Sequence, residues 1–174
     1  LEKAALAQIE NITAVNASLV TNLHANLGGL YRINGHPDLA REHMEKSISL
    51  LDQFNLLHIN DSIPQIANYA MFLTEQQEPE RGISELQKLS GIIKEYHSDE
   101  CLDYAKVQET LATIYLMTAN LSHAKTHFKK AFKIYEKIWA DEPEMIEAKY
   151  LEIQELYPQI GFSIGKTLSG LLTK

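Results

Sequence analysis

Apolar residues recur every three to four positions along almost the whole chain, and no segment alternates in the strand-like way. This spacing is typical of amphipathic helices with one apolar face. The predicted helices span residues 2–13, 16–33, 37–54, 62–76, 79–96, 100–118, 121–139, 142–157 and 160–172. Turn residues separate them; at Asn34-Gly35-His36-Pro37, Gly closes one helix and Pro opens the next. The pattern therefore predicts an all-α protein.

Small residues repeat along these helices with a period of 42 residues. Gly28, Ala70 and Ala112 share one position of the repeat, and Ala40, Gly82 and Ala124 share another. A fixed period in this range is the signature of a helical solenoid. We expect the small side chains to let the two helices of each hairpin approach closely, so that larger neighbours interlock. The expected core residues are Leu27, Tyr31, Met44, Tyr69, Leu73, Leu86, Leu111, Tyr115 and Phe128.

The repeated residues resemble the tetratricopeptide repeat (TPR). The first copy reads Leu27-Gly28-x-x-Tyr31, and the third reads Leu111-Ala112-x-x-Tyr115. The 42-residue spacing is similar to the longer repeats of kinesin light chains. The resemblance implies a right-handed superhelical solenoid of antiparallel helix hairpins. It predicts a single array over residues 1–174, in which the helix pairs are 16–57, 58–99 and 100–141, preceded by a half repeat over 1–14 and followed by a degenerate repeat or C-terminal cap over 142–174. Because the register begins in mid-repeat, we expect the chain to be part of a longer protein.

The resemblance also implies a binding surface, since arrays of this family bind partners on the concave side lined by the first helix of each hairpin. Carried over by register, the peptide-binding groove residues are Asn22, Asn26, Arg32, Asn68, Met71, Glu75, Lys106, Glu109, Thr113 and Met117. Asn26 and Asn68 are expected to hydrogen-bond a peptide backbone, because a side-chain amide can donate and accept at once. The alternative is that these two amides only cap the helix or solvate its surface.

The other groove residues have simpler predicted roles. The charged ones, Arg32, Glu75, Lys106 and Glu109, are expected to select ligand side chains by charge. Met71 and Met117 would form an adaptable apolar floor, or else pack between repeats.

The net charge and the cysteine content restrict the classes of partner and the compartment that we expect. The formal net charge of −7 argues against a nucleic acid or an anionic membrane as the main partner. The one cysteine, Cys101, leaves no internal disulfide and fits a reducing compartment, so we expect a cytoplasmic location. No apolar run approaches the ~18 residues of a membrane span.

No residue pattern predicts an enzyme, a cofactor or a metal centre. His123 and His127 have the i, i+4 spacing of a zinc pair, but no third ligand follows, and we interpret them as an exposed pair on the outward side of their helix. The favoured function is a protein- or peptide-binding scaffold. The alternative is a peptide-sensing regulatory array that controls an attached DNA-binding or signalling domain. An uncovered apolar face on a terminal helix would also allow a homodimer.

Overall fold

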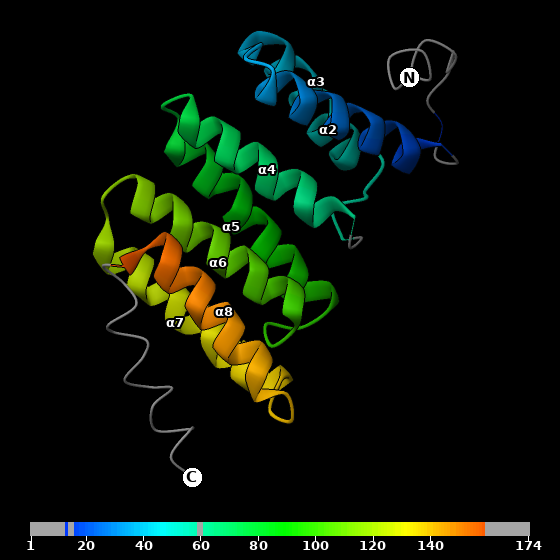
Figure 1. Cartoon of the computed structure of the whole chain (residues 1–174). Helices are drawn as coiled ribbons and strands as arrows, with labels where there is room; N and C mark the ends of the chain where they lie inside the picture. Colours follow the sequence, from blue (N-terminus) through cyan, green and yellow to red (C-terminus); the bar gives the residue numbers. More distant parts are fainter. Residues whose placement is uncertain (1–12, 14–15, 59–60, 159–174) are drawn as a thin grey trace. The chain divides into compact units, whose positions relative to one another are not determined.

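The computed structural model describes residues 13, 16–58 and 61–158 (Figure 1). Within these ranges every regular element is an α-helix, as predicted. The helices are α2 (Ala17–Ile33), α3 (Pro37–Gln53), α4 (Ser62–Glu75), α5 (Pro79–Tyr96), α6 (Leu102–Met117), α7 (Leu121–Ile138) and α8 (Pro143–Leu156). Each lies within two residues of a predicted helix. The predicted helix over 160–172 falls outside the described residues, and so does that over 2–13 except for Thr13.

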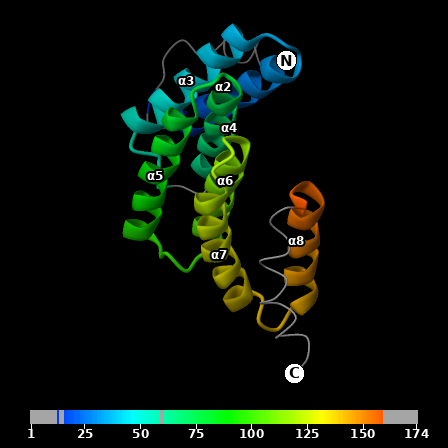
Figure 2. The same ribbon diagram turned by 90° about the vertical axis from the view of Figure 1, so that its left-hand side faces the viewer.

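The chain divides into two compact units, which we describe separately. Unit 1 covers Leu1–Tyr96 and unit 2 covers His97–Lys174. In unit 1, α2 pairs with α3 and α4 pairs with α5; in unit 2, α6 pairs with α7, and α8 packs beside α7 (Figures 1 and 2). The three hairpins are the three predicted helix pairs.

Small residues do bring the hairpin helices together. A Cβ added to Gly28 would lie 2.5 Å from Met44 Cγ, and one added to Gly82 would lie 2.6 Å from the carbonyl oxygen of Ala70. Neither distance is an acceptable contact between non-bonded heavy atoms. In the third hairpin both positions are alanine, and Ala112 and Ala124 are fully buried. The predicted reason for the small residues is confirmed.

The first helix of every hairpin ends in the same way. Gly35, Gln77 and Ala119, which are 42 residues apart, all have left-handed backbone angles, with φ of 73°, 65° and 58°. The next residue donates its N–H to a carbonyl five residues back, from His36 to Tyr31 at 2.9 Å, from Glu78 to Leu73 at 2.8 Å and from Asn120 to Tyr115 at 2.7 Å. This is the Schellman arrangement of a helix C-terminus. The repeat is therefore conserved in backbone conformation even where Gly is absent.

Most of the expected core residues are buried, but two are not. Leu73, Leu86 and Phe128 are completely buried, and Leu27, Met44, Tyr69 and Leu111 nearly so. Tyr31 and Tyr115 are only half-buried. Each ring stacks on a histidine from the second helix of its hairpin and stays partly exposed, while Tyr115 also packs against the buried cluster of unit 2.

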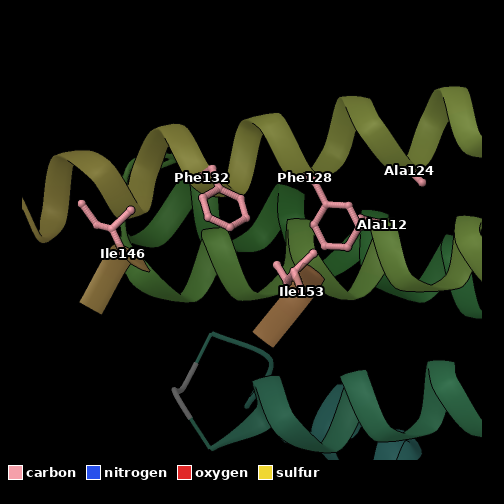
Figure 3. Packing of buried hydrophobic residues seen from close by; sticks show 6 residues of the cluster. All are labelled: Ala112, Ala124, Phe128, Phe132, Ile146 and Ile153. Atoms are coloured by element: carbon pink, nitrogen blue, oxygen red, sulfur yellow. The ribbon is translucent and has the colours of Figure 1, made fainter. Parts of the chain in front are cut away.

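The core of unit 2 extends from the third hairpin to α8 (Figure 3). Ile146 and Ile153, seven residues apart on one face of α8, join Phe128 and Phe132 of α7 in one buried cluster. Residues at i and i+7 lie on the same side of a helix, so a single apolar stripe seats α8 on the hairpin. Cys101 has a local role in this unit, since its sulfur accepts a hydrogen bond from the N–H of Tyr104 at 3.5 Å and caps α6.

Candidate functional site: the exposed faces of the first helices

In unit 1 the two first helices, α2 and α4, lie side by side and are tied at two levels. At one level Gln65 donates to the side-chain oxygen of Asn22 at 2.6 Å, and its own buried amide oxygen accepts from Ser47 Oγ of α3 at 2.6 Å. At the other level Arg32 and Glu75 form a two-pronged ion pair, with N–O distances of 2.8 and 2.5 Å. Bidentate pairs of this kind fix geometry as well as charge. These ties hold the two helices in one register.

The predicted peptide clamp lies between the two ties along the helices. Asn26 on α2 and Asn68 on α4 occupy the same repeat position, and both side chains are exposed. Met71 is half-buried on α4, while Leu30 and Ile33 on α2 are 50% and 84% exposed. The face therefore combines open amides with uncovered apolar side chains.

The ion pair changes the picture of two predicted groove residues. The sequence suggested that Arg32 and Glu75 would each read a ligand charge, but here each satisfies the other. Their side chains are still about one-third exposed. An exposed ion pair takes little free energy to break, so charge selection by these residues stays a prediction. The structure itself shows that they join the two repeats.

A second polar network, which the sequence reading missed, joins the two hairpins of unit 1. Arg41 of α3 donates to Glu78 at 2.5 Å, and Arg81 donates to both Glu78 and Glu45. The hydrogen bonds from Arg81 and Arg41 lower the pKa of the Glu78 carboxyl. Tyr69 donates to Glu45 at 3.1 Å, and burial, with that carboxylate beside it, raises the pKa of Tyr69 to about 12. The sequence could have indicated this network, because Arg41 precedes Glu78 by 37 residues and Glu45 precedes Arg81 by 36 residues, which is close to one repeat.

In unit 2 the predicted groove residue Glu109 is the centre of a structural cluster. Its carboxylate accepts from the Tyr135 hydroxyl at 2.6 Å and from Lys149 Nζ of α8 at 3.0 Å. Burial, reinforced by Glu109, raises the pKa of Tyr135. Burial alone would lower the pKa of Lys149, but its bonds to Glu152 and Glu109 raise it overall. Glu109 thus links three helices, and its predicted part in ligand selection stays untested.

The remaining groove residues of unit 2 all lie on α6. Lys106 is exposed, with Asp103 one turn away at 3.7 Å. Thr113 is half-buried and donates to the backbone carbonyl of Glu109 at 3.1 Å. Met117 is 46% exposed at the end of the helix. Lys106 and Met117 therefore present side chains to solvent, whereas the Thr113 hydroxyl bonds its own helix.

The first hairpin contains a stacked ring cluster. The rings of His43 and Tyr31 are parallel, with centroids 5.4 Å apart. His43 Nδ1 lies 2.9 Å from His24 Nδ1, so one nitrogen must donate while the other accepts. Burial, and then the neighbouring His43, lower the pKa of His24. These surroundings therefore favour the neutral form of His24.

The third hairpin repeats this cluster and corrects the interpretation of its histidines. Both His123 and His127 stack on Tyr115, at 4.9 and 5.3 Å between centroids. His127 is half-buried, and its Nδ1 lies 2.9 Å from Gln108 Oε1. Burial, followed by Lys130 and His123, lowers the pKa of His127 to about 4. The prediction of an exposed outward pair holds for His123 alone, because the His127 ring is half-buried and bonds Gln108 of α6.

Over residues 13, 16–58 and 61–158, no cluster of three or more His, Cys, Asp or Glu side chains could hold a metal ion. In the same part of the chain no helix has the length and apolarity needed to cross a membrane.

Comparison with known proteins agrees with this repeat architecture. Residues 62–137, which comprise the second and third hairpins, match the family model of the tetratricopeptide repeat. The structure is similar to the crystal structure of BtubC (BKLC) from P. vanneervenii, with a TM-score of 0.73 and 15% sequence identity over 99% of this chain and 72% of that one. No curated protein matches the sequence. Residues 62–137 therefore match the tetratricopeptide repeat family, and the fold of the chain is similar to that of BtubC.

Proposed function

We propose that unit 1 binds an extended segment of a partner protein on the exposed face of α2 and α4. The family supports a protein-interaction scaffold; binding of a peptide in the groove is the further step. The observation that carries it is the pair Asn26 and Asn68, two exposed amides at one repeat position on adjoining helices. Each amide can donate to a peptide carbonyl and accept from a peptide N–H. A ladder of this kind would hold a ligand backbone whatever its side chains.

The two ties of α2 to α4 favour this proposal because they pre-organise the face. The ties at Asn22 and at Arg32 are ten residues apart on α2, which corresponds to roughly 15 Å of helix. A face that is already fixed loses less conformational entropy when it binds.

The apolar neighbours of the clamp supply the second part of the binding energy. Ile33 is 84% exposed, Leu30 is 50% exposed, and Met71 is half-buried. Burying such side chains against a ligand contributes about 25 cal/mol for each Å² covered. We therefore expect the preferred ligand to carry apolar side chains beside the amide-bonded backbone.

A peptide-display selection tests the proposal. The parent chain is compared with Asn26→Ala/Asn68→Ala, and with Gln53→Ala/Gln87→Ala as a matched control that removes two exposed amides from the second helices. We expect a shared peptide motif from the parent and the control, and its loss from the asparagine variant. Equal recovery by all three baits, or none by any, would refute the clamp.

The regulatory alternative makes a different prediction for the same ligand. If peptide binding controlled an attached domain, the array would change conformation when the selected peptide binds. Small-angle scattering with and without that peptide distinguishes the two. An unchanged profile supports a passive scaffold, and a changed radius of gyration supports a sensor.

Self-association is a separate proposal that the exposed apolar side chains support. Leu19, Leu30 and Ile33 on α2 are at least half exposed, and so are Leu151 and Leu156 on α8. Uncovered apolar residues of this kind favour contact with a second copy. Light scattering across a concentration series measures the mass, and a constant monomer mass would exclude the homodimer.

A further inference from the structure

Helix α7 carries an unusual concentration of positive charge. Its eighteen residues include five lysines and one glutamate, in a chain with 16 basic and 23 acidic residues overall. The rest of the chain therefore holds 11 basic and 22 acidic side chains. The lysines are Lys125, Lys129, Lys130, Lys133 and Lys137. We call this set the α7 lysine row.

The row faces solvent over its length. Four of its members recur at intervals of four residues, from Lys125 to Lys137, and therefore share one face of the helix. Lys125 is half-buried and the others are exposed. Phe128 and Phe132 lie on the opposite, buried side. The twelve residues between the ends of the row span roughly 18 Å.

The corresponding helices of unit 1 use their cations differently. On α3, Arg41 pairs with Glu78 at 2.5 Å, and on α5, Lys88 pairs with Asp52 at 2.7 Å. In unit 2, Lys137 pairs with Glu100. The other four lysines of the row form no ion pair with any residue that the structure describes. Their charge is not needed to join the helices of the unit, which is why it calls for another explanation.

We propose that the α7 lysine row docks an acidic segment of a partner protein. Charge complementarity is the basis: a row of like charges held on one rigid face attracts an opposite row and steers its approach. The acidic remainder of the chain favours a short segment over a long polyanion, because DNA, RNA or an anionic membrane extends well beyond 18 Å and would meet the repelling acidic surface. A segment with three or four carboxylates spaced to match would suffice.

The first experiment uses a fluorescein-labelled peptide of ten glutamates and measures anisotropy on the full chain at about 50 mM and about 300 mM salt, since screening weakens such contacts. Lys129→Glu/Lys133→Glu reverses two charges of the row. Lys46→Glu/Lys94→Glu makes the same change in net charge on exposed positions of α3 and α5. We expect the first variant to bind roughly tenfold more weakly than the second at low salt. Equal weakening by both would mean that only net charge matters and would overturn the proposal.

Two further measurements separate loss of charge from charge repulsion, and an acidic peptide from other polyanions. Lys129→Gln/Lys133→Gln removes the charges without repulsion, should show parental helicity by circular dichroism, and should give an intermediate loss of binding. A single-stranded oligonucleotide and vesicles with anionic lipid are run at the same salt. Tighter binding of either than of the glutamate peptide, or no binding of the peptide by the parent, would overturn the assignment to an acidic protein segment.

Discussion

The second hairpin differs from the first and third in what fills the same repeat positions. In the first and third, a tyrosine stacks on a histidine, Tyr31 on His43 and Tyr115 on His127. In the second, those positions hold Leu73, which is fully buried, and Glu85. All three hairpins nevertheless close at a small residue and end the first helix with a left-handed residue. The backbone conformation is thus more constant from repeat to repeat than the side chains at equivalent positions.

This contrast separates two requirements of a helical repeat. The close approach of the helices leaves no room for an added atom, so the small positions are restricted by geometry. The positions of Tyr31 and His43 are less restricted, since the second hairpin has Leu73 and Glu85 there. Substitutions at the two kinds of position should therefore differ in their effects.

The largest effect is expected for Gly82→Ala in the second hairpin. The new methyl group would meet the Ala70 carbonyl oxygen at 2.6 Å, and backbone atoms cannot rotate away. We expect a loss of about 2–3 kcal/mol in the free energy of unfolding, measured by urea titration. Gly91→Ala is the control in the same helix, since its Cβ would meet nothing within 4 Å, and it should gain about 0.5–1 kcal/mol in helix propensity.

Gly28→Ala extends this test to the first hairpin. There the nearest atom is Met44 Cγ in a side chain, and the nearest backbone atoms, Ala40 O and Met44 N, lie farther away at 3.2 Å. The loss should be smaller than for Gly82→Ala, on the order of 1 kcal/mol. Equal losses at both glycines would show that the backbone contact is not the deciding feature.

A smaller effect is expected at the left-handed residues. Ala119 has φ of 58°, which is unfavourable for a residue with a Cβ. Ala119→Gly should raise stability by about 0.5–1 kcal/mol, and Gly35→Ala should lower it by a similar amount. Thermal unfolding of the two variants is sufficient, and shifts of the same sign would contradict the assignment.

The smallest expected effect is the pH dependence of the free energy of unfolding. It distinguishes the first and third hairpins, which contain the ring clusters, from the second. The pKa values of His24 and His127 are lowered in the folded chain. The unfolded chain therefore binds these protons more readily, so the contribution is complete above the ordinary histidine pKa of about 6.5 and is lost as the pH falls. For His127 the loss continues down to its folded pKa of about 4.

Urea midpoints at several pH values between those limits measure this slope. His127→Gln should flatten this slope, because it removes the titrating ring whose folded pKa is lowered. The half exposure of the His127 ring limits the size of the effect through solvent screening. A slope unaffected by His127→Gln would mean that other groups set the acid sensitivity.

Much of the fold was predictable because apolar period and turn residues are local signals. The helix boundaries followed from them, and the positions of Gly28 and Gly82 from the 42-residue register. The same register would have located Gln77 and Ala119 from Gly35, although neither residue suggests a left-handed turn by itself.

The site was less predictable because register places a residue on a face without naming its partner. The exposure of Asn26 and Asn68 agrees with the predicted face. The pairing of Arg32 with Glu75 depends on side-chain reach across two helices, which no periodicity encodes. The same is true of Glu109, whose partners lie 26 and 40 residues away along the chain.

The first interhelical turn also bears on chemical ageing. Asn34-Gly35 is the dipeptide in which the glycine nitrogen most readily attacks the asparagine side chain, closing a succinimide ring and releasing ammonia. Here the Gly35 N–H donates to the Arg32 carbonyl at 3.2 Å, and the Asn34 amide donates to the Leu30 carbonyl at 2.8 Å. Both reacting groups are thereby held in hydrogen bonds that the attack would have to break. The folded turn should deamidate more slowly than the unfolded chain, so the helix cap protects the covalent integrity of the sequence that forms it.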